Sequence, residues 1–211
     1  MALYSIKNNL QYATLKTLSL VSISVMSPQQ SVQELFRTAD CVCFDVDSTV
    51  IRDEGIDELA NFCGKGDEVK RLTAEAMGGS MTFQEALKKR LDIIRPSVSQ
   101  IREYLEKFPV HLTPGVSQLV KELHERGVAV YLVSGGFRVS SNQLRGKGLV
   151  IRRLNEQHGY QRLIVIGDGA TDAEACPPAD RFIGEFEVKK RASWYVTDFQ
   201  DLIQTLAIQA K

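Results

Sequence analysis

Three short apolar runs, each followed at once by a polar or glycine-rich turn, constrain the fold of this chain more than any other feature. They span residues 41–46, 128–133 and 163–166. Each run is almost continuously apolar and rich in β-branched residues, which is typical of strands buried on both faces of a sheet. Amphipathic helical patterns separate the runs. Strands that alternate with helices predict an α/β fold, with a Rossmann-like parallel sheet flanked by helices.

A helical insertion is predicted between the first two strands. Thr82 stands three residues before Glu85, which is the spacing of a capping box, and Thr113–Pro114 match the cap and first residue of a later helix. The later helix is long enough to connect the two strands, so the earlier helical sequence is free to form a small cap. The predicted domains are a leader (1–30), a helical cap (54–108) and a core (31–53 and 109–211).

Composition excludes several classes of partner. Lys plus Arg and Asp plus Glu balance at 26 each, so the net charge gives no reason to expect nucleic acid. No apolar run is long enough to span a bilayer, and no membrane partner is expected. The 4 cysteines match neither a disulfide framework nor a zinc pattern, so we expect buried free thiols in a reducing compartment.

The first thirty residues differ from the rest. Lys7 and Lys16 are their only charged side chains, and serine and threonine recur. A transit peptide is also poor in acids and rich in serine, but it should contain arginine, and the first arginine is Arg37. We expect a poorly ordered leader and a cytoplasmic protein, with organellar targeting or an ordered extra strand as the alternatives.

Carboxylates follow two of the three predicted strands. Asp45 and Asp47 end the first, and Asp168 and Asp172 follow the third. Because the carboxyl ends of parallel strands meet at one edge of a sheet, these side chains should share a cleft. Mutual repulsion makes such a group costly unless its members share a cation or a proton, and an all-oxygen site favours Mg²⁺. Taken alone, Asp45 and Asp47 would also fit an ordinary turn with a helix cap.

Two further features are weak when taken alone. Ser134-Gly135-Gly136 follows the second strand and offers a hydroxyl with exposed backbone N–H groups, which suit a phosphate. Lys147 lies between two glycines and could begin a helix, although a lysine in that setting is more often a solvated turn. The Ser-Gly-Gly loop and the two acidic segments stand at matching strand ends, which favours a functional site there over an ordinary turn.

The four ordered motifs of the haloacid dehalogenase-like phosphatases resemble four segments of this chain. The segments are Phe44-Asp-Val-Asp-Ser-Thr-Val50, Ser134-Gly-Gly, Lys147 and Gly167-Asp-Gly-Ala-Thr-Asp172. Longer stretches around them closely resemble the phosphoserine phosphatases, over about residues 32–205. The resemblance implies a Mg²⁺-dependent phosphoric monoester hydrolase that converts O-phospho-L-serine to L-serine and phosphate, the last step of serine biosynthesis.

The resemblance also assigns the chemistry. Asp45 would be the nucleophile that forms an aspartyl-phosphate, and Asp47 would act as general acid and then general base. Mg²⁺ would be held by Asp45, the backbone carbonyl of Asp47 and Asp168, with Asp172 as outer support. Lys147 would pair with Asp45 and with the phosphate.

Substrate contacts are implied in the same way. Phosphate oxygens would meet Ser134, Gly135, Gly136 and Thr171. Glu54 would meet the substrate ammonium and Arg90 its carboxylate, with Met77 and Gly78 as further contacts. Without the resemblance, Glu54 fits the acidic start of a helix and Arg90 a solvated helix face. A homodimer is left open.

The chain departs from the family in the core. Only residues 137–146 separate the Ser-Gly-Gly loop from Lys147, and residues 185–188 replace a glycine-rich turn. A splice form or mispredicted gene model would explain both. It would leave residues 128–133 at an unprotected sheet edge and displace Lys147 from the cleft. The alternatives are a related small-molecule phosphatase, a catalytically impaired chain that pairs through that edge, and a receiver domain.

Overall fold

One parallel sheet forms the centre of the molecule. The structure is a computed structural model that describes residues 26–76, 79, 81–135, 146–184 and 190–208. Its five strands have the order β2-β1-β3-β4-β5, and every neighbouring pair is parallel. The predicted α/β fold is therefore confirmed. The strands are β1 (Cys41–Phe44), β2 (Ala129–Leu132), β3 (Leu163–Gly167), β4 (Arg181–Gly184) and β5 (Trp194–Tyr195).

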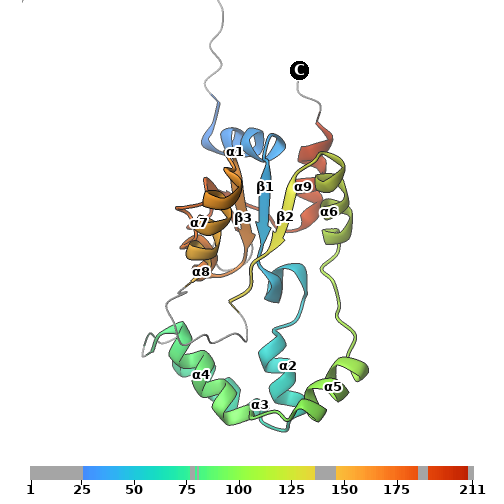
Figure 1. Cartoon of the computed structure of the whole chain (residues 1–211), viewed down its shortest axis with the longest axis vertical. Helices are drawn as coiled ribbons and strands as arrows, with labels where there is room; N and C mark the ends of the chain where they lie inside the picture. Colours follow the sequence, from blue (N-terminus) through green and yellow to red (C-terminus); the bar gives the residue numbers. More distant parts are fainter. Residues whose placement is uncertain (1–25, 77–78, 80, 136–145, 185–189, 209–211) are drawn as a thin grey trace, which may run out of the picture.

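Helices cover both faces of the sheet (Figure 1). Val42 and Phe44 of β1 point into one apolar core, and Cys41 and Cys43 point into the other. This alternation along one strand is what buries β1 on both sides. The first core is covered by α1 (Pro28–Arg37), α6 (Val116–Glu125) and α9 (Phe199–Ala207), and the second by α7 (Lys147–His158) and α8 (Ala170–Ala173).

The helical insertion after β1 forms a cap with a core of its own. It contains α2 (Gly55–Phe62), α3 (Gly66–Glu75), α4 (Phe83–Ile94) and α5 (Val98–Lys107). The capping box predicted at Thr82 is present at the start of α4. Figure 1 shows the cap beyond the carboxyl ends of the strands. Its apolar centre consists of Ile56, Leu59, Ala60, Val69, Leu87 and Ile94.

Two chain segments connect the cap to the sheet, and they are hydrogen-bonded to each other. Arg52 N–H donates to the His111 carbonyl at 3.1 Å, and Thr113 N–H donates to the Val50 carbonyl at 2.9 Å. Ile51 and Leu112 form an antiparallel bridge between these two bonds. The outgoing and returning segments therefore run as a short paired ribbon.

Two helix starts differ from their sequence predictions. The predicted start at Pro114 is wrong, because Gly115 has φ +86° and α6 begins after it, at Val116. A residue in that left-handed region cannot continue a right-handed helix, so residues 113–115 form a turn instead. At the other end, α1 begins at Pro28, so the predicted leader overlaps its first residues. Residues 1–25 of that leader lie outside the described part of the chain.

Strand β2 lies at one end of the sheet, as expected for residues 128–133. Among the described strands its neighbour is β1, and Leu132 is 60% exposed. The predicted shortening of the core falls on residues 137–146 and 185–188, and all of these except Gly146 lie outside the described residues, so it stays a prediction.

All four cysteines are free. Cys41 and Cys43 are buried, and Cys63 and Cys176 are half-buried. In the part of the chain that the structure describes, no helix has the length and apolar character needed to cross a bilayer.

Candidate active site

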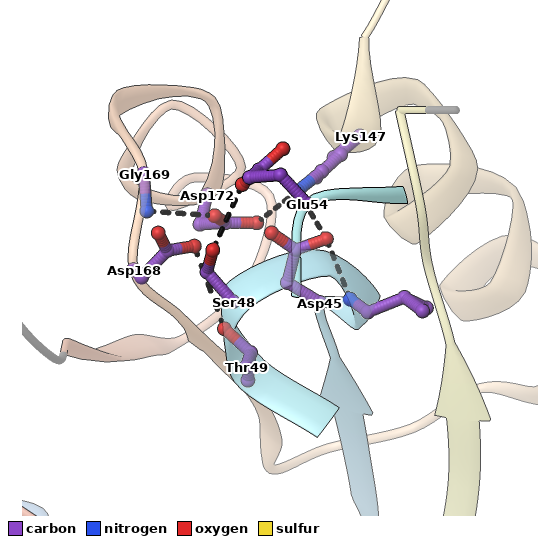
Figure 2. A network of polar contacts seen from close by, with 9 residues as sticks. Asp45, Ser48, Thr49, Glu54, Lys147, Asp168, Gly169 and Asp172 are labelled. Carbon is purple, nitrogen blue, oxygen red and sulfur yellow. Dashed lines mark hydrogen bonds and ion pairs between the residues drawn. The ribbon is translucent and has the colours of Figure 1, made fainter. Parts of the chain in front are cut away.

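Three carboxylates meet where β1 and β3 end. Asp45 follows β1, Asp168 follows β3, and Asp172 lies in α8 directly after it. One oxygen from each carboxylate lies within 4.8 Å of the others. Asp45 and Asp172 are buried, and Asp168 is half-buried. Figure 2 shows the three side chains grouped together. The sequence predicted this convergence from the parallel strands.

Lys147, the first residue of α7, reaches into this cluster. Its Nζ lies 2.6 Å from Asp45 Oδ1 and 2.7 Å from Asp172 Oδ1. The residue is 8% exposed. The expected displacement of Lys147 from the cleft is therefore wrong, because the start of α7 projects the side chain directly between the two carboxylates. The pairing with Asp172 was not foreseen from the sequence.

The cluster has unusual electrostatics. Burial, with the nearby charge of Asp45, raises the pKa of Asp168 to about 6. Burial also raises the pKa of Asp172, although Lys147 opposes the shift. Burial alone would lower the pKa of Lys147, but Asp172 and Asp45 outweigh it and the net pKa is raised. The site therefore holds a charged ammonium among carboxylates that repel one another, and a further cation would relieve that repulsion.

Backbone and hydroxyl groups fix the carboxylates in place. Val46 N–H donates to Asp45 Oδ1 at 2.7 Å, and Gly169 N–H donates to Asp172 Oδ2 at 3.1 Å. The buried hydroxyl of Thr49 donates to Asp168 Oδ1 at 3.5 Å. Sequence reasoning missed Thr49, although it lies in the quoted motif four residues after Asp45.

Gly167 allows Asp172 to approach the strand. A Cβ atom at position 167 would lie 2.6 Å from Asp172 Oδ2. Such a contact is too short for any side chain, so the absence of a side chain at the end of β3 makes room for the carboxylate.

Asp47 does not join the carboxylate cluster. Its Oδ1 instead accepts a hydrogen bond from Gly55 N–H at 3.0 Å, at the first residue of α2. The Asp47 carboxylate therefore faces the junction between core and cap.

Ser48 and Glu54 make a contact that the sequence did not predict. Ser48 Oγ donates to Glu54 Oε1 at 2.8 Å (Figure 2). Glu54 is exposed, but neighbouring groups remove part of the water around its carboxylate, which raises its pKa, and the hydrogen bond from Ser48 opposes that shift. The turn that carries Asp45 is therefore connected to the start of the cap through side chains.

The remaining predicted site residues are only partly described. Arg90 lies half-buried in α4, and its Nε is buried with no hydrogen-bond partner among the described residues. Gly135 lies near Lys147 and beside Phe83 of the cap, since a Cβ there would be 3.8 Å from Lys147 Cε and 3.3 Å from Phe83 Cε1. Ser134 is exposed next to it, and Thr171 lies in α8 beside Asp172. Met77, Gly78 and Gly136 lie outside the described residues.

The donor atoms of the cluster suit a hard cation. Asp45, Asp168 and Asp172 offer only oxygen, and neither histidine nor cysteine belongs to the described group. Hard divalent ions prefer such oxygen ligands. The raised pKa of Asp168 also fits a carboxylate whose charge lacks a full partner.

Comparison with known proteins agrees with this geometry. A family profile described as haloacid dehalogenase-like hydrolase matches residues 39–180, which include Asp45, Lys147 and Asp172. The chain belongs to the haloacid dehalogenase-like hydrolases. The match begins just before β1 and continues through α8, so it contains the whole cap insertion.

Individual proteins are also similar over most of the chain. The phosphoserine phosphatase of Mus musculus is 45% identical over 223 residues, covering 86% of this chain and 99% of its own. A structure of DsGPDH of Dunaliella salina has a TM-score of 0.75 at 31% identity, covering 86% of this chain and 38% of that chain. A phospho-aspartyl intermediate analogue of phosphoserine phosphatase has a TM-score of 0.66 at 25% identity, covering 79% of this chain and 98% of that chain.

Proposed function

We propose that this chain is a Mg²⁺-dependent phosphoserine phosphatase, which hydrolyses O-phospho-L-serine to L-serine and phosphate. The observation that carries the proposal is the contact of Lys147 with both Asp45 and Asp172, beside Asp168. This group combines a carboxylate nucleophile with fixed positive charge at the edge of the sheet where ligands bind. The identity of 45% with a mouse phosphoserine phosphatase supports the substrate.

Asp45 is the nucleophile in this proposal. Its carboxylate oxygen attacks phosphorus in line, the bond from phosphorus to the serine oxygen breaks, and an aspartyl-phosphate forms. Val46 N–H binds Oδ1 and restrains the rotation of the carboxylate. The similarity to a phospho-aspartyl intermediate analogue supports the same intermediate here.

Asp47 transfers the protons. It protonates the leaving serine oxygen and then accepts a proton from the water that hydrolyses the aspartyl-phosphate. Gly55 N–H restrains the orientation of its carboxylate from the cap side. Closure of the cap over a substrate would therefore bring the proton donor and the leaving group together.

Positive charge offsets the repulsion between Asp45 and a phosphate dianion. Lys147 supplies one fixed cation, and its two carboxylate contacts keep it charged. Mg²⁺ would be held by Asp45, Asp168 and the backbone carbonyl of Asp47, with Asp172 supporting them from outside. When bound, the ion supplies further positive charge beside the phosphate.

Glu54 and Arg90 select the amino acid part of the substrate. A zwitterion needs one partner of each sign, and these residues provide a carboxylate and a guanidinium on the cap side. The Arg90 Nε, buried with no described partner, is a donor that a substrate carboxylate would satisfy. Ser134, Gly135, Gly136 and Thr171 would bind the phosphate oxygens, with Met77 and Gly78 beside the serine.

Phosphate release from O-phospho-L-serine, with and without Mg²⁺, tests the proposal. We expect ordinary enzymatic turnover with Mg²⁺, loss of turnover with a chelator, and no turnover for Asp45→Asn. Turnover of aryl phosphates but not of phosphoserine would assign a different substrate. A folded chain without any phosphate release would show that its core does not support catalysis.

A further inference from the structure

The hydrogen bond between Ser48 and Glu54 points to a positioning function for Ser48. Glu54 is the cap residue of α2, but its side chain makes no capping hydrogen bond. It turns instead to Ser48, whose hydroxyl lies 2.8 Å from Oε1. The carboxylate that stands at the start of the cap is therefore held by the core of the molecule.

The backbone at Ser48 makes this contact available. Ser48 has φ +55° and ψ 4°, a left-handed conformation that residues other than glycine rarely adopt. The chain reverses there, and Asp47 and Ser48 both reach the start of α2. Asp47 accepts the N–H of Gly55, the first residue of α2, and Glu54 meets Ser48.

A glutamate so placed would otherwise have considerable freedom. Glu54 is an exposed residue, and an exposed glutamate samples many rotamers in solution. A single hydrogen bond to a backbone-constrained serine restricts that freedom before any ligand binds, and such preorganisation increases affinity.

We infer that Ser48 is a positioning residue, which orients Glu54 so that the site prefers phosphate esters bearing an ammonium group. The inference deepens the proposed function and rests on it. In this inference Ser48 acts on the substrate only through Glu54. It takes no part in the attack of Asp45 on phosphorus.

The test compares two substrates in kcat/KM. One is O-phospho-L-serine, and the other is 3-phosphooxypropanoate, which lacks only the ammonium group. The variant Ser48→Gly removes the hydroxyl while glycine tolerates the positive φ. We expect the preference for phosphoserine to fall about 5- to 10-fold, mainly through KM, as for the loss of one intramolecular hydrogen bond of ordinary strength.

A double-mutant cycle separates positioning from general damage. In a Glu54→Gln chain the preference should already be low, and adding Ser48→Gly should change it less than about twofold, because the partner is no longer charged. The inference would be refuted if Ser48→Gly lowered kcat/KM equally for both substrates. It would also be refuted if Ser48→Gly lowered the preference for phosphoserine equally with and without the Glu54 carboxylate.

The outcomes also distinguish the inference from the proposed function. If the parent chain prefers phosphoserine and Ser48→Gly keeps that preference, the inference fails and the proposed function stands. If the parent chain hydrolyses both substrates equally, no ammonium is recognised at Glu54 and the inference fails, whereas hydrolysis of neither substrate would overturn the proposed function as well.

Discussion

Replacement of Lys147 by methionine would leave Asp45 and Asp172 facing each other without the ammonium group that now lies between them. Methionine has a similar length and fills the same space, so the change removes charge and creates little cavity. At the observed distance of 2.6 Å, one ion-pair contact corresponds to about 6 kcal/mol of gross Coulomb energy at an effective dielectric of about 20. The desolvation of both partners offsets much of this energy.

We therefore expect Lys147→Met to lower the free energy of unfolding by about 3 kcal/mol, the lower end for breaking a buried ion pair. The lower end applies because the pKa of Asp172 is already raised, so this carboxyl can take up a proton once the lysine is lost. For a chain of 211 residues, about 3 kcal/mol corresponds to a fall in Tm of about 6–12 °C. Differential scanning fluorimetry at pH 7.5 measures this shift.

The same variant should also lose most of its catalytic activity. Removal of one fixed group that stabilises transition-state charge typically costs about 10²–10³ in kcat. Phosphate release at a temperature where the variant is folded would measure the loss. Lys121→Met is the matched control, because the Lys121 side chain is 76% exposed on α6 and should matter little. If Lys147→Met kept more than about a tenth of kcat, the assignment of Lys147 to the site would be refuted.

Four further predictions follow from particular residues. Because the pKa of Asp168 is raised to about 6 without metal, protons compete with a cation for this carboxylate at low pH. The affinity for Mg²⁺, measured by calorimetry, should therefore be about tenfold weaker at pH 5 than at pH 7. A pH-independent affinity would contradict the raised pKa. Gly167→Ala should displace Asp172 and reduce kcat about tenfold or more, measured as phosphate release; unchanged kinetics would mean that the strand end can shift to accept a Cβ. Arg90→Ala should reduce kcat/KM for phosphoserine about 100-fold while changing p-nitrophenyl phosphate turnover far less, and an equal loss on both would argue against carboxylate recognition. Leu132→Lys should reduce light scattering on heating, because a charge on the exposed edge strand opposes strand addition; equal scattering would show that the β2 edge does not drive aggregation.

The sequence predicted the part of the site that depends on strand topology. Parallel strands end at one edge, so Asp45, Asp168 and Asp172 had to converge once the strands were recognised. Lys147 was expected at the start of a helix, and its helix follows the polar end of β2. These residues stand at or next to the ends of strongly patterned elements, and such patterns can be recognised in short sequence windows.

The missed contacts depend on local conformation instead. The Ser48–Glu54 bond requires a left-handed serine, and no propensity rule favours serine over glycine there. The start of α6 was mispredicted for the same reason. Thr113–Pro114 is an ordinary helix-start signal, but the left-handed conformation of Gly115 delays the helix to Val116. Side-chain pairs across the site, such as Thr49 with Asp168, could be located only after the three-dimensional arrangement was known.

The paired ribbon between cap and sheet has a mechanical consequence. Two independent tethers would let the cap twist and slide, but backbone bonds between positions 50 and 113 and between 52 and 111 join them into one arm. We expect such an arm to act as a hinge that bends about a single axis. Its inner end is Val50, five residues from Asp45 and in the same turn as Ser48. Each rotation of the cap would therefore displace the loop beside the nucleophile. Opening of the cap and relaxation of this loop would then occur together.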